Sequence, residues 1–304
     1  MNPVKPIIQA QRIGHATLDT VDLQRATEYF VSVNGLVNVA ADKHAVHLTS
    51  NFGQLTLTLR QSDRAHCSRL SFEVAPDTDF RQVAQDLARL GIASEIRTDP
   101  FPGSPECLSI TDPNGTKIDL FRSWMFLIDN RPTAGVTPLK LGHIGMYSPD
   151  LEKTIEFYSQ VLGFRVSDWL DDFFVFMRCN SDHHTVNFFR AGAAKLHHIA
   201  FEVKDMAHIQ HACETLSHFR IPIGWGPIRV AGPGHNLAVF HRNPDDHAVE
   251  YFCELDQMRS EALGYFEPRP WHADKPQRPR TWDAHGWECG WGTPRAPEYL
   301  RPIP

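Results

Sequence analysis

The sequence lacks the features that mark several large classes of protein. Its six cysteines never form a Cys-x-x-Cys pair, which argues against a disulfide scaffold and a thiolate zinc site. No apolar run approaches the roughly 20 residues of a membrane span. The net charge of −6 comes without a basic cluster that would attract nucleic acid or an anionic membrane. The opening residues, MNPVKPIIQAQRIGH, do not have the charged-then-apolar order of a signal peptide. We therefore expect a cytoplasmic protein with reduced thiols and with neither nucleic acid nor membrane as partner.

What the chain does contain is length, apolar residues and histidine. Its 304 residues suffice for two domains of about 150 residues each. Hydrophobic residues make up 42% of the chain, enough for a sizeable core, and 17 residues are histidine. This abundance of imidazole favours metal or proton chemistry without locating it.

An internal repeat organises the chain. Three blocks of the first half recur in the same order in the second half, at offsets of 128, 129 and 131 residues. The matched blocks are 12–36 with 140–164, 66–74 with 196–203, and 111–121 with 242–252. Matched blocks in a fixed order with slowly drifting offsets indicate a duplication.

Each half in turn consists of two similar units. A unit opens with a strand-like run and continues with an amphipathic helix, such as the one predicted from the cap Asp150 to the terminal Gly163. Short β-rich runs follow, of which NLAVFHRNPDDHAVEYF predicts a hairpin that turns at Asp245 and Asp246. The sequence thus predicts an α+β fold of four β-α-β-β-β units, beginning near residues 12, 66, 140 and 196.

Three regions follow from this reading. Residues 1–125 are expected to form an N-terminal domain without a metal site, 126–256 a catalytic metal-binding domain, and 257–304 a tail. Residues 122–138 link the two halves. The tail is rich in proline and holds four of the seven tryptophans, so we expect no regular element in it, and expect it to wrap over the body or a neighbouring subunit. We expect its histidines, His272 and His285, at the surface.

The duplication singles out one candidate metal site. The second half offers two histidines and a carboxylate where the first half offers a histidine, an arginine and a carboxylate. The paired positions are His143 with His15, His198 with Arg69, and Glu250 with Asp119. Arginine does not ligate metals, so only the second half retains a His-His-carboxylate set, which suits an iron with open coordination positions.

The motifs LGHIGM, LHHIAFEV and GPGHNLAVFHRNPDDHAVEYF, together with the four units, resemble the vicinal oxygen chelate superfamily over about residues 10–255. More narrowly, they resemble its two-domain type I extradiol, or catechol meta-cleaving, dioxygenases. The resemblance implies two tandem domains, each an open curved sheet or barrel. It also implies Fe(II), or alternatively Mn(II), bound by His143, His198 and Glu250.

The resemblance also assigns roles around the metal. It implies that His184, in SDHHTVNFF, is an acid–base group beside the dioxygen site. The family usually has a histidine where this chain has Ala231 and a tyrosine where it has Phe240; both normally contact the substrate. His235 is the preferred substitute for the missing histidine, and His241 on the same strand as Phe240 is expected to point outward.

Strand alternation distinguishes the two members of each histidine pair. Since successive side chains of a strand point to opposite faces, His197 and His183 are expected to face away from the site that His198 and His184 face. Trp169, Phe173, Phe174 and Phe189 are candidates either for an aromatic pocket or for ordinary core positions.

The expected function is therefore ring cleavage of a small aromatic diol by O2, giving a muconic semialdehyde-type product, in an enzyme that assembles as a homo-oligomer. Three alternatives stay open at this point. The first is another chelate-dependent enzyme, such as a glyoxalase or epimerase. The second is a non-catalytic protein that binds aromatic ligands. The third keeps the dioxygenase but uses His15 in place of His143 as ligand.

Overall fold

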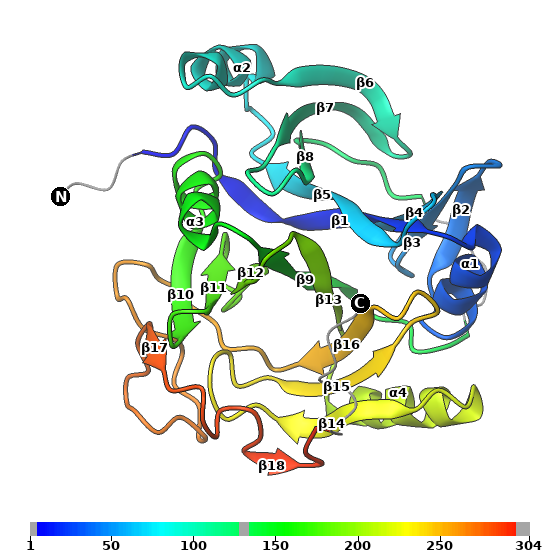
Figure 1. Cartoon of the computed structure of the whole chain (residues 1–304), viewed down its shortest axis with the longest axis vertical. Helices are drawn as coiled ribbons and strands as arrows, with labels where there is room; N and C mark the ends of the chain where they lie inside the picture. Colours follow the sequence, from blue (N-terminus) through cyan, green and yellow to red (C-terminus); the bar gives the residue numbers. More distant parts are fainter. Residues whose placement is uncertain (1–4, 128–133, 296–304) are drawn as a thin grey trace.

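The computed structural model describes residues 5–127 and 134–295. Within them the chain forms two curved β-sheets, with the four helices at the periphery (Figure 1). Among these residues, none of the helices combines the length and apolar character that a membrane crossing requires.

The first sheet contains two successive β-α-β-β-β units, as predicted. The first unit consists of β1 (Ala10–Thr20), α1 (Leu23–Ser32), β2 (Val37–Ala41), β3 (Ala45–Thr49) and β4 (Leu55–Gln61). The second consists of β5 (His66–Val74), α2 (Phe80–Arg89), β6 (Glu95–Phe101), β7 (Ser104–Thr111) and β8 (Lys117–Phe121).

The second sheet repeats this plan and adds two short strands from the tail. Its first unit consists of β9 (Lys140–Ser148), α3 (Leu151–Gln160), β10 (Arg165–Leu170), β11 (Phe174–Arg178) and β12 (Val186–Arg190). Its second consists of β13 (Lys195–Glu202), α4 (Met206–His218), β14 (Ile223–Arg229), β15 (Leu237–Arg242) and β16 (Ala248–Cys253). The tail strands are β17 (Arg280–Trp282) and β18 (Trp291–Gly292).

The two sheets share strand order and register, which confirms the duplication. The order is β2-β3-β4-β1-β5-β8-β7-β6 in the first and β17-β10-β11-β12-β9-β13-β16-β15-β14-β18 in the second. Arg69 of β5 pairs with Lys117 of β8 in parallel, and at the duplicated position His198 of β13 pairs with Ala248 of β16. The predicted hairpin of β15 and β16 forms as well.

A glycine before each strand histidine is part of the duplicated packing. A Cβ on Gly14 would lie 2.4 Å from the ring of Phe121, and one on Gly142 would lie 2.3 Å from the ring of Phe252. The rings occupy the space that a side chain would need. This contact explains the glycine of the Gly-His dipeptide that the two halves share, without reference to a metal.

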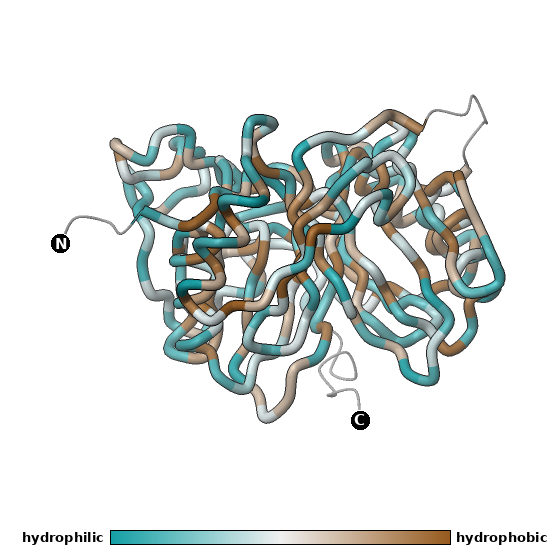
Figure 2. The backbone as a smooth tube through the Cα atoms, turned by 90° about the horizontal axis from the view of Figure 1, so that it is seen from above, coloured by the Kyte–Doolittle hydropathy of each residue, from teal (hydrophilic) through white to brown (hydrophobic). Residues whose placement is uncertain are grey.

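The helices begin where the sequence predicts. The side chain of Asp150 accepts a hydrogen bond from the backbone N–H of Lys153, and Asp22 caps α1 in the same way through Arg25. Their buried faces join one core that draws residues from both halves, with hydrophobic segments inside and hydrophilic loops outside (Figure 2). The core therefore also fixes one half against the other.

The tail wraps over the second sheet, as predicted, but it is not without regular structure. β17 extends the sheet beside β10 in parallel, and β18 pairs antiparallel with β14. The expectation of no regular element was wrong, because an exposed sheet edge supplies hydrogen-bond partners that tail composition does not reveal. The last strand of the first sheet ends at Phe121, and the first strand of the second sheet begins at Lys140. The domain limits at residues 125 and 256 stay predictions. Residues 128–133 of the linker and 296–304 of the tail lie outside the described residues.

Candidate metal centre

Three side chains on neighbouring strands converge in the second sheet. His143 lies on β9, His198 on β13 and Glu250 on β16, and these strands are adjacent in that order. Ala200 pairs in register with both His143 and Glu250, and His198, two residues earlier, faces the same side. The Nε2 atoms of His143 and His198 lie 3.1 and 3.7 Å from Oε2 of Glu250. One ligand atom from each residue lies within 4.8 Å of the others, so the structure brings the predicted set together.

Burial disfavours every charged form in this cluster, both the Glu250 carboxylate and the protonated imidazoles. All three side chains are almost inaccessible to solvent. Because desolvation penalises a charged group, burial raises the pKa of Glu250 to about 7 and lowers the pKa values of His143 and His198 to about 3. Neutral imidazoles are the form that ligates a metal, and a divalent cation would compensate the carboxylate. The donor set of two imidazole nitrogens and one carboxylate oxygen therefore fits Fe(II) or Mn(II).

Asn236 orients the carboxylate. Its Nδ2 donates a hydrogen bond of 2.8 Å to Oε1 of Glu250, which leaves Oε2 toward the two histidines. The sequence reading did not identify this residue. Asn236 sits in the loop before β15, where no periodic pattern indicates which way a side chain points.

Gly145 provides the space for the ring of His198. A Cβ at Gly145 would lie 2.3 Å from two atoms of that ring and 2.4 Å from Oδ1 of Asn187. We expect Gly145→Ala to displace His198 and to lower the bound metal per chain well below that of the wild type, as measured by metal analysis after anaerobic reconstitution. Gly192→Ala is the matched control, since a Cβ there meets nothing within 4 Å. Full metal loading of the Gly145→Ala protein would contradict the assignment of His198 as ligand.

His184 lies against the cluster of His143, His198 and Glu250. Its ring centroid is 4.2 Å from that of His143, and it is buried. Burial, followed by the neighbouring histidines 143, 183 and 198, holds the pKa of His184 well below its usual value. His184 is therefore neutral, with one ring nitrogen that carries no proton.

His183 does not face outward, which corrects the alternation argument. It is 0% exposed, its Nδ1 lies 3.0 Å from Nδ1 of His184, and its Nε2 lies 2.9 Å from Oδ2 of Asp168. The pair precedes β12 and lies in irregular backbone. Side-chain alternation holds only within a regular strand, so it could not separate these two residues.

The prediction for His197 was wrong for a related reason. The register of β13 against β9 shifts between Leu196 and His198, so a bulge interrupts the alternation at this point. Nδ1 of His197 lies 2.6 Å from Nδ1 of His198, and its ring stacks on Phe189 at 4.0 Å. His197 thus contacts the ligand His198 and does not face away from it.

A second buried cluster joins the tail to the loop that carries His235. Nδ1 of His235 lies 2.8 Å from Oδ2 of Asp256, and Nε2 of His272 lies 2.8 Å from Oδ1 of the same carboxylate. His272 is buried, so its predicted surface position was wrong, whereas His285 is exposed as expected. The loop borders His184, because a Cβ on Gly234 would lie 3.3 Å from its Cε1.

Phe240, which stands where the family usually has a tyrosine, and its neighbour His241 face opposite sides of β15. Phe240 pairs with Glu250 across β15 and β16, and its ring stacks on Trp225 at 4.6 Å. His241 faces the other side of the strand, as predicted, but it is buried: its Nε2 lies 2.5 Å from the hydroxyl of Tyr29 in the first half. Its expected outward position was wrong because the first half covers that face of the sheet.

Aromatic rings surround the histidine pair that includes His184. Phe176 lies edge-on to His184 at 5.1 Å, and Phe174 stacks on Phe189 at 3.4 Å. Phe173 packs against this group, whereas Trp169 packs against the main core. The predicted aromatic candidates therefore divide between the site side and the core.

The first half replaces the metal position by an ion pair. Nη1 of Arg69 lies 2.6 Å from Oδ1 of Asp119, a buried carboxylate that also accepts a hydrogen bond from Ser109. His15 is bound to Ser71, at 2.9 Å between Nε2 and Oγ. His15 lies in the first sheet, and the residue that joins His198 and Glu250 in the cluster is His143, so the structure argues against the alternative with His15.

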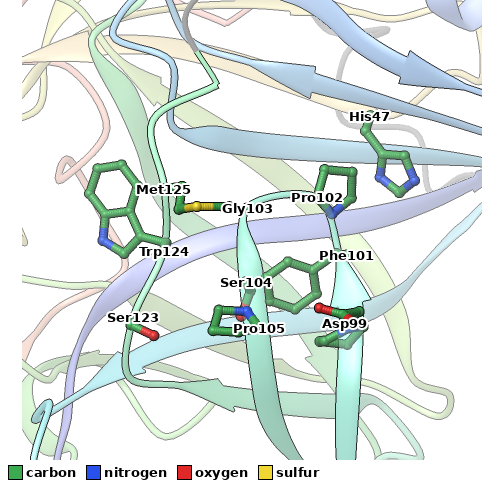
Figure 3. A pocket seen from close by; sticks show the side chains of 11 residues that line it. His47, Asp99, Phe101, Pro102, Gly103, Ser104, Pro105, Ser123, Trp124 and Met125 are labelled. Atoms are coloured by element: carbon green, nitrogen blue, oxygen red, sulfur yellow. The ribbon is translucent and has the colours of Figure 1, made fainter.

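A cavity of about 500 Å³ opens on the same half, beside the hairpin of β6 and β7 (Figure 3). Its lining includes His47, Asp99, Phe101, Pro102, Trp124 and Met125. None of the metal-site residues lines it. The metal centre is thus defined by its converging side chains and not by this cavity.

Comparison with known proteins first gives the class. Residues 140–251, which carry all three ligands, match the Glyoxalase/Bleomycin resistance protein/Dioxygenase superfamily. This part of the chain is a domain of that superfamily, and the two tandem sheets have the two-domain vicinal oxygen chelate fold of extradiol dioxygenases.

Particular relatives share most of the chain. Metapyrocatechase 2 of Cupriavidus necator is 24% identical over 275 residues, covering 84% of each chain, and a metapyrocatechase of Pseudomonas sp. (strain CF600) is 23% identical over 266 residues, covering 81% of this chain and 86% of the other. The homoprotocatechuate 2,3-dioxygenase of Brevibacterium fuscum superimposes with a TM-score of 0.78 at 24% identity, over 98% of this chain and 94% of the other. A Mn(II)-bound glyoxalase from Novosphingobium aromaticivorans superimposes with a TM-score of 0.81 at 23% identity, over 98% and 95%.

Proposed function

We propose that this protein is an extradiol dioxygenase that cleaves the ring of a catechol-type substrate with O2 and uses Fe(II), or alternatively Mn(II), as its metal. The product is of the muconic semialdehyde type. The observation that carries this proposal is the convergence of His143, His198 and Glu250, with His184 against them. Relatives named metapyrocatechase and 3-methylcatechol 2,3-dioxygenase support the reaction class.

The three ligands would occupy only one face of the metal. Two imidazoles and one carboxylate leave coordination positions open for a bidentate diol and for dioxygen. When bound, the metal supplies the redox chemistry that joins diol and dioxygen. The chain's part is to hold the ligands in neutral and anionic form, keep the rings in place through Gly145, and exclude bulk water by burial.

His184 is proposed as the group that handles protons. As a neutral imidazole next to His143, it can take a proton from a substrate hydroxyl and return it later to the developing product. The ring of Phe176 packs edge-on against the ring of His184 and so limits how that ring can turn.

We expect His184→Gln to lower kcat by about 10²- to 10⁴-fold, the usual contribution of a positioned acid or base. Metal content and melting temperature should stay near those of the wild type, because the residue is not a ligand. Oxygen-electrode assays with a set of catechols, together with metal analysis, measure this. His211→Gln on exposed helix surface is the matched control. A kcat within twofold of the wild type would remove His184 from the mechanism.

His235 is proposed as the substrate-contacting group that replaces the histidine missing at position 231, with Phe240 forming part of the substrate's apolar surroundings. What supports His235 is its buried place in the loop beside His184 and its hydrogen bond to Asp256, which fixes the ring. Trp225 holds Phe240 in a stacked orientation.

Two observations favour a second candidate function. Phe240 and Ala231 lack the polar groups that usually contact a diol, and a Mn(II)-bound glyoxalase is among the structural neighbours. The deciding experiment is anaerobic loading with Fe(II) or Mn(II), followed by oxygen uptake and detection of a yellow product with substituted catechols. Uptake with stoichiometric ring cleavage supports the dioxygenase, whereas metal binding without uptake favours the glyoxalase- or epimerase-like reaction. A protein that binds aromatic diols but no metal would be a non-catalytic binder, which the assembled ligand set argues against.

The expected setting of the enzyme stays a prediction. We expect a cytoplasmic homo-oligomer whose partners are a small aromatic diol and O2. The six free cysteines agree with a reducing compartment such as the cytoplasm. Size-exclusion chromatography with light scattering measures the assembly.

A further inference from the structure

The C-terminal tail is connected to His184 by an unbroken series of hydrogen bonds. Asp168, on β10, is buried and receives two bonds from the tail: Nε1 of Trp282 donates to Oδ2 at 2.9 Å, and the backbone N–H of Arg280 donates to Oδ1 at 2.8 Å. Oδ2 of Asp168 also lies 2.9 Å from Nε2 of His183, and Nδ1 of His183 lies 3.0 Å from Nδ1 of His184.

This series constrains which nitrogen atoms carry protons. A carboxylate only accepts, so Nε2 of His183 must be the donor to Asp168. With one proton on each ring, Nδ1 of His183 is then bare and accepts from Nδ1 of His184. A single proton on Nδ1 of His184 leaves its Nε2 bare. The second ring nitrogen of His184 is thereby left free to accept a proton.

We propose that Asp168 and His183, locked in place by Trp282 of the tail, are positioning residues that hold His184 in the Nδ1–H tautomer and so make its Nε2 a proton acceptor. This inference rests on the proposed function, in which His184 takes a proton from the substrate. A histidine held in the other tautomer would present N–H at Nε2 and could not do so.

The surroundings of His183 show why the constraint is strict. Its side chain is fully buried, and its other ring neighbours are the apolar rings of Phe176 and Phe266, at 5.7 and 4.8 Å. Asp168 is fully engaged as well, since both of its oxygens already accept from the tail. With solvent excluded, each ring nitrogen of His183 has one protein partner, so Asp168 decides the orientation of the whole series.

A pair of substitutions separates this role from a structural one. Trp282→Phe removes one donor but keeps the carboxylate, which preserves the tautomers. Asp168→Asn alone sets the amide N–H₂ against an N–H of the tail in either orientation, that of Arg280 or that of Trp282, so it selects neither orientation. In the double variant the amide oxygen accepts from the N–H of Arg280, so the amide N–H₂ faces His183 and donates. His183 must then donate to His184, and the proton of His184 moves to Nε2.

The test reads the tautomer directly. Nitrogen-15 spectra of histidine-labelled protein, metal-free and loaded with Zn(II), distinguish Nδ1–H from Nε2–H, and His184→Gln assigns the signal. We expect Nδ1–H in the wild type and in Trp282→Phe, and Nε2–H in the double variant. The Fe(II)-loaded double variant should lose about 10- to 100-fold in kcat, as outer-shell changes do, with KM within about threefold. Trp282→Phe should stay within about threefold.

Glu261→Gln is the matched control for tail anchoring, because it removes the ion pair of the tail with Arg178 without touching the series; it should change neither tautomer nor kcat. Nε2–H in the wild type, or Nδ1–H in the double variant, overturns the proposal even if that variant is unstable. A switched tautomer with unchanged kcat also overturns it. Failure of the proposed function would look different: the wild type would show the Nδ1–H signal and yet take up no oxygen with any catechol.

Discussion

Replacing Glu250 by glutamine is expected to weaken metal binding by more than about 100-fold, since even outer-shell changes cost 10- to 100-fold. Oxygen uptake should fall to background. The amide keeps the shape of the side chain, and its oxygen can still accept from Asn236, so the fold should be retained. The cause of the loss is charge: the cluster contains two neutral imidazoles and a single anionic ligand.

The same substitution should stabilise the metal-free protein at high pH. Burial raises the pKa of Glu250 to about 7, above its ordinary 4.5. The folded state therefore holds this proton more tightly than the unfolded state, and ionisation costs stability as pH rises between these values. The advantage of Glu250→Gln should be absent below about pH 4.5 and reach about 3 kcal/mol above pH 7. Urea unfolding of both metal-free proteins at several pH values measures it. A variant that binds metal normally, or is less stable than the wild type at pH 8, would contradict this account.

Replacing Asp119 by asparagine makes the same chemical change at the duplicated position and should have the opposite result. The Asp119 carboxylate, 0% exposed, is bound to Arg69, so it already has a permanent cation. Removing its charge leaves a partly buried guanidinium without its counter-charge. We expect a loss of about 2 kcal/mol in the free energy of unfolding. Metal content and kcat should be unchanged.

The two variants control for each other. Glu250→Gln should lose metal and gain metal-free stability, and Asp119→Asn should lose stability and keep metal. Denaturant unfolding with metal analysis on both proteins tests the pair. Loss of metal from Asp119→Asn would mean that the first half contributes to the metal site, contrary to the geometry of Arg69 and His15.

This contrast gives a physical reading of the duplication. Both halves keep a buried carboxylate at the end of the same strand pairing, and both supply it with a positive partner. In the first half this partner is a side chain of the protein itself, that of Arg69. In the second half the corresponding position holds His198, which is neutral when buried, so the compensating charge has to come from a bound cation.

Much of the fold could be predicted because its signals are local or repeated. The cap of Asp150, the apolar spacing of its helix and the hairpin turn at Asp245 are short-range features, and the structure has each of them. The three ligands lie far apart along the chain, but comparing the halves aligned them. His198 was distinguished from its neighbour by the arginine at the matched position.

The remaining site residues depend on irregular backbone. The bulge beside His197 and the irregular backbone at His183 break the two-residue period on which side-chain direction is predicted. Sequence alone gave both neighbours the wrong direction. Asn236 was missed for the same reason, since a loop has no period.

The sequence by itself determined the four units, their pairing into two halves and the His-His-carboxylate set, because duplication and periodicity are properties of residue order. Only the tertiary structure decided that the tail reaches the site. Trp282 meets Asp168, and His272 meets Asp256, across contacts that no pattern in the chain encodes. Such contacts form because a sheet edge and buried carboxylates need partners, and which segment supplies them depends on how the whole chain folds back on itself.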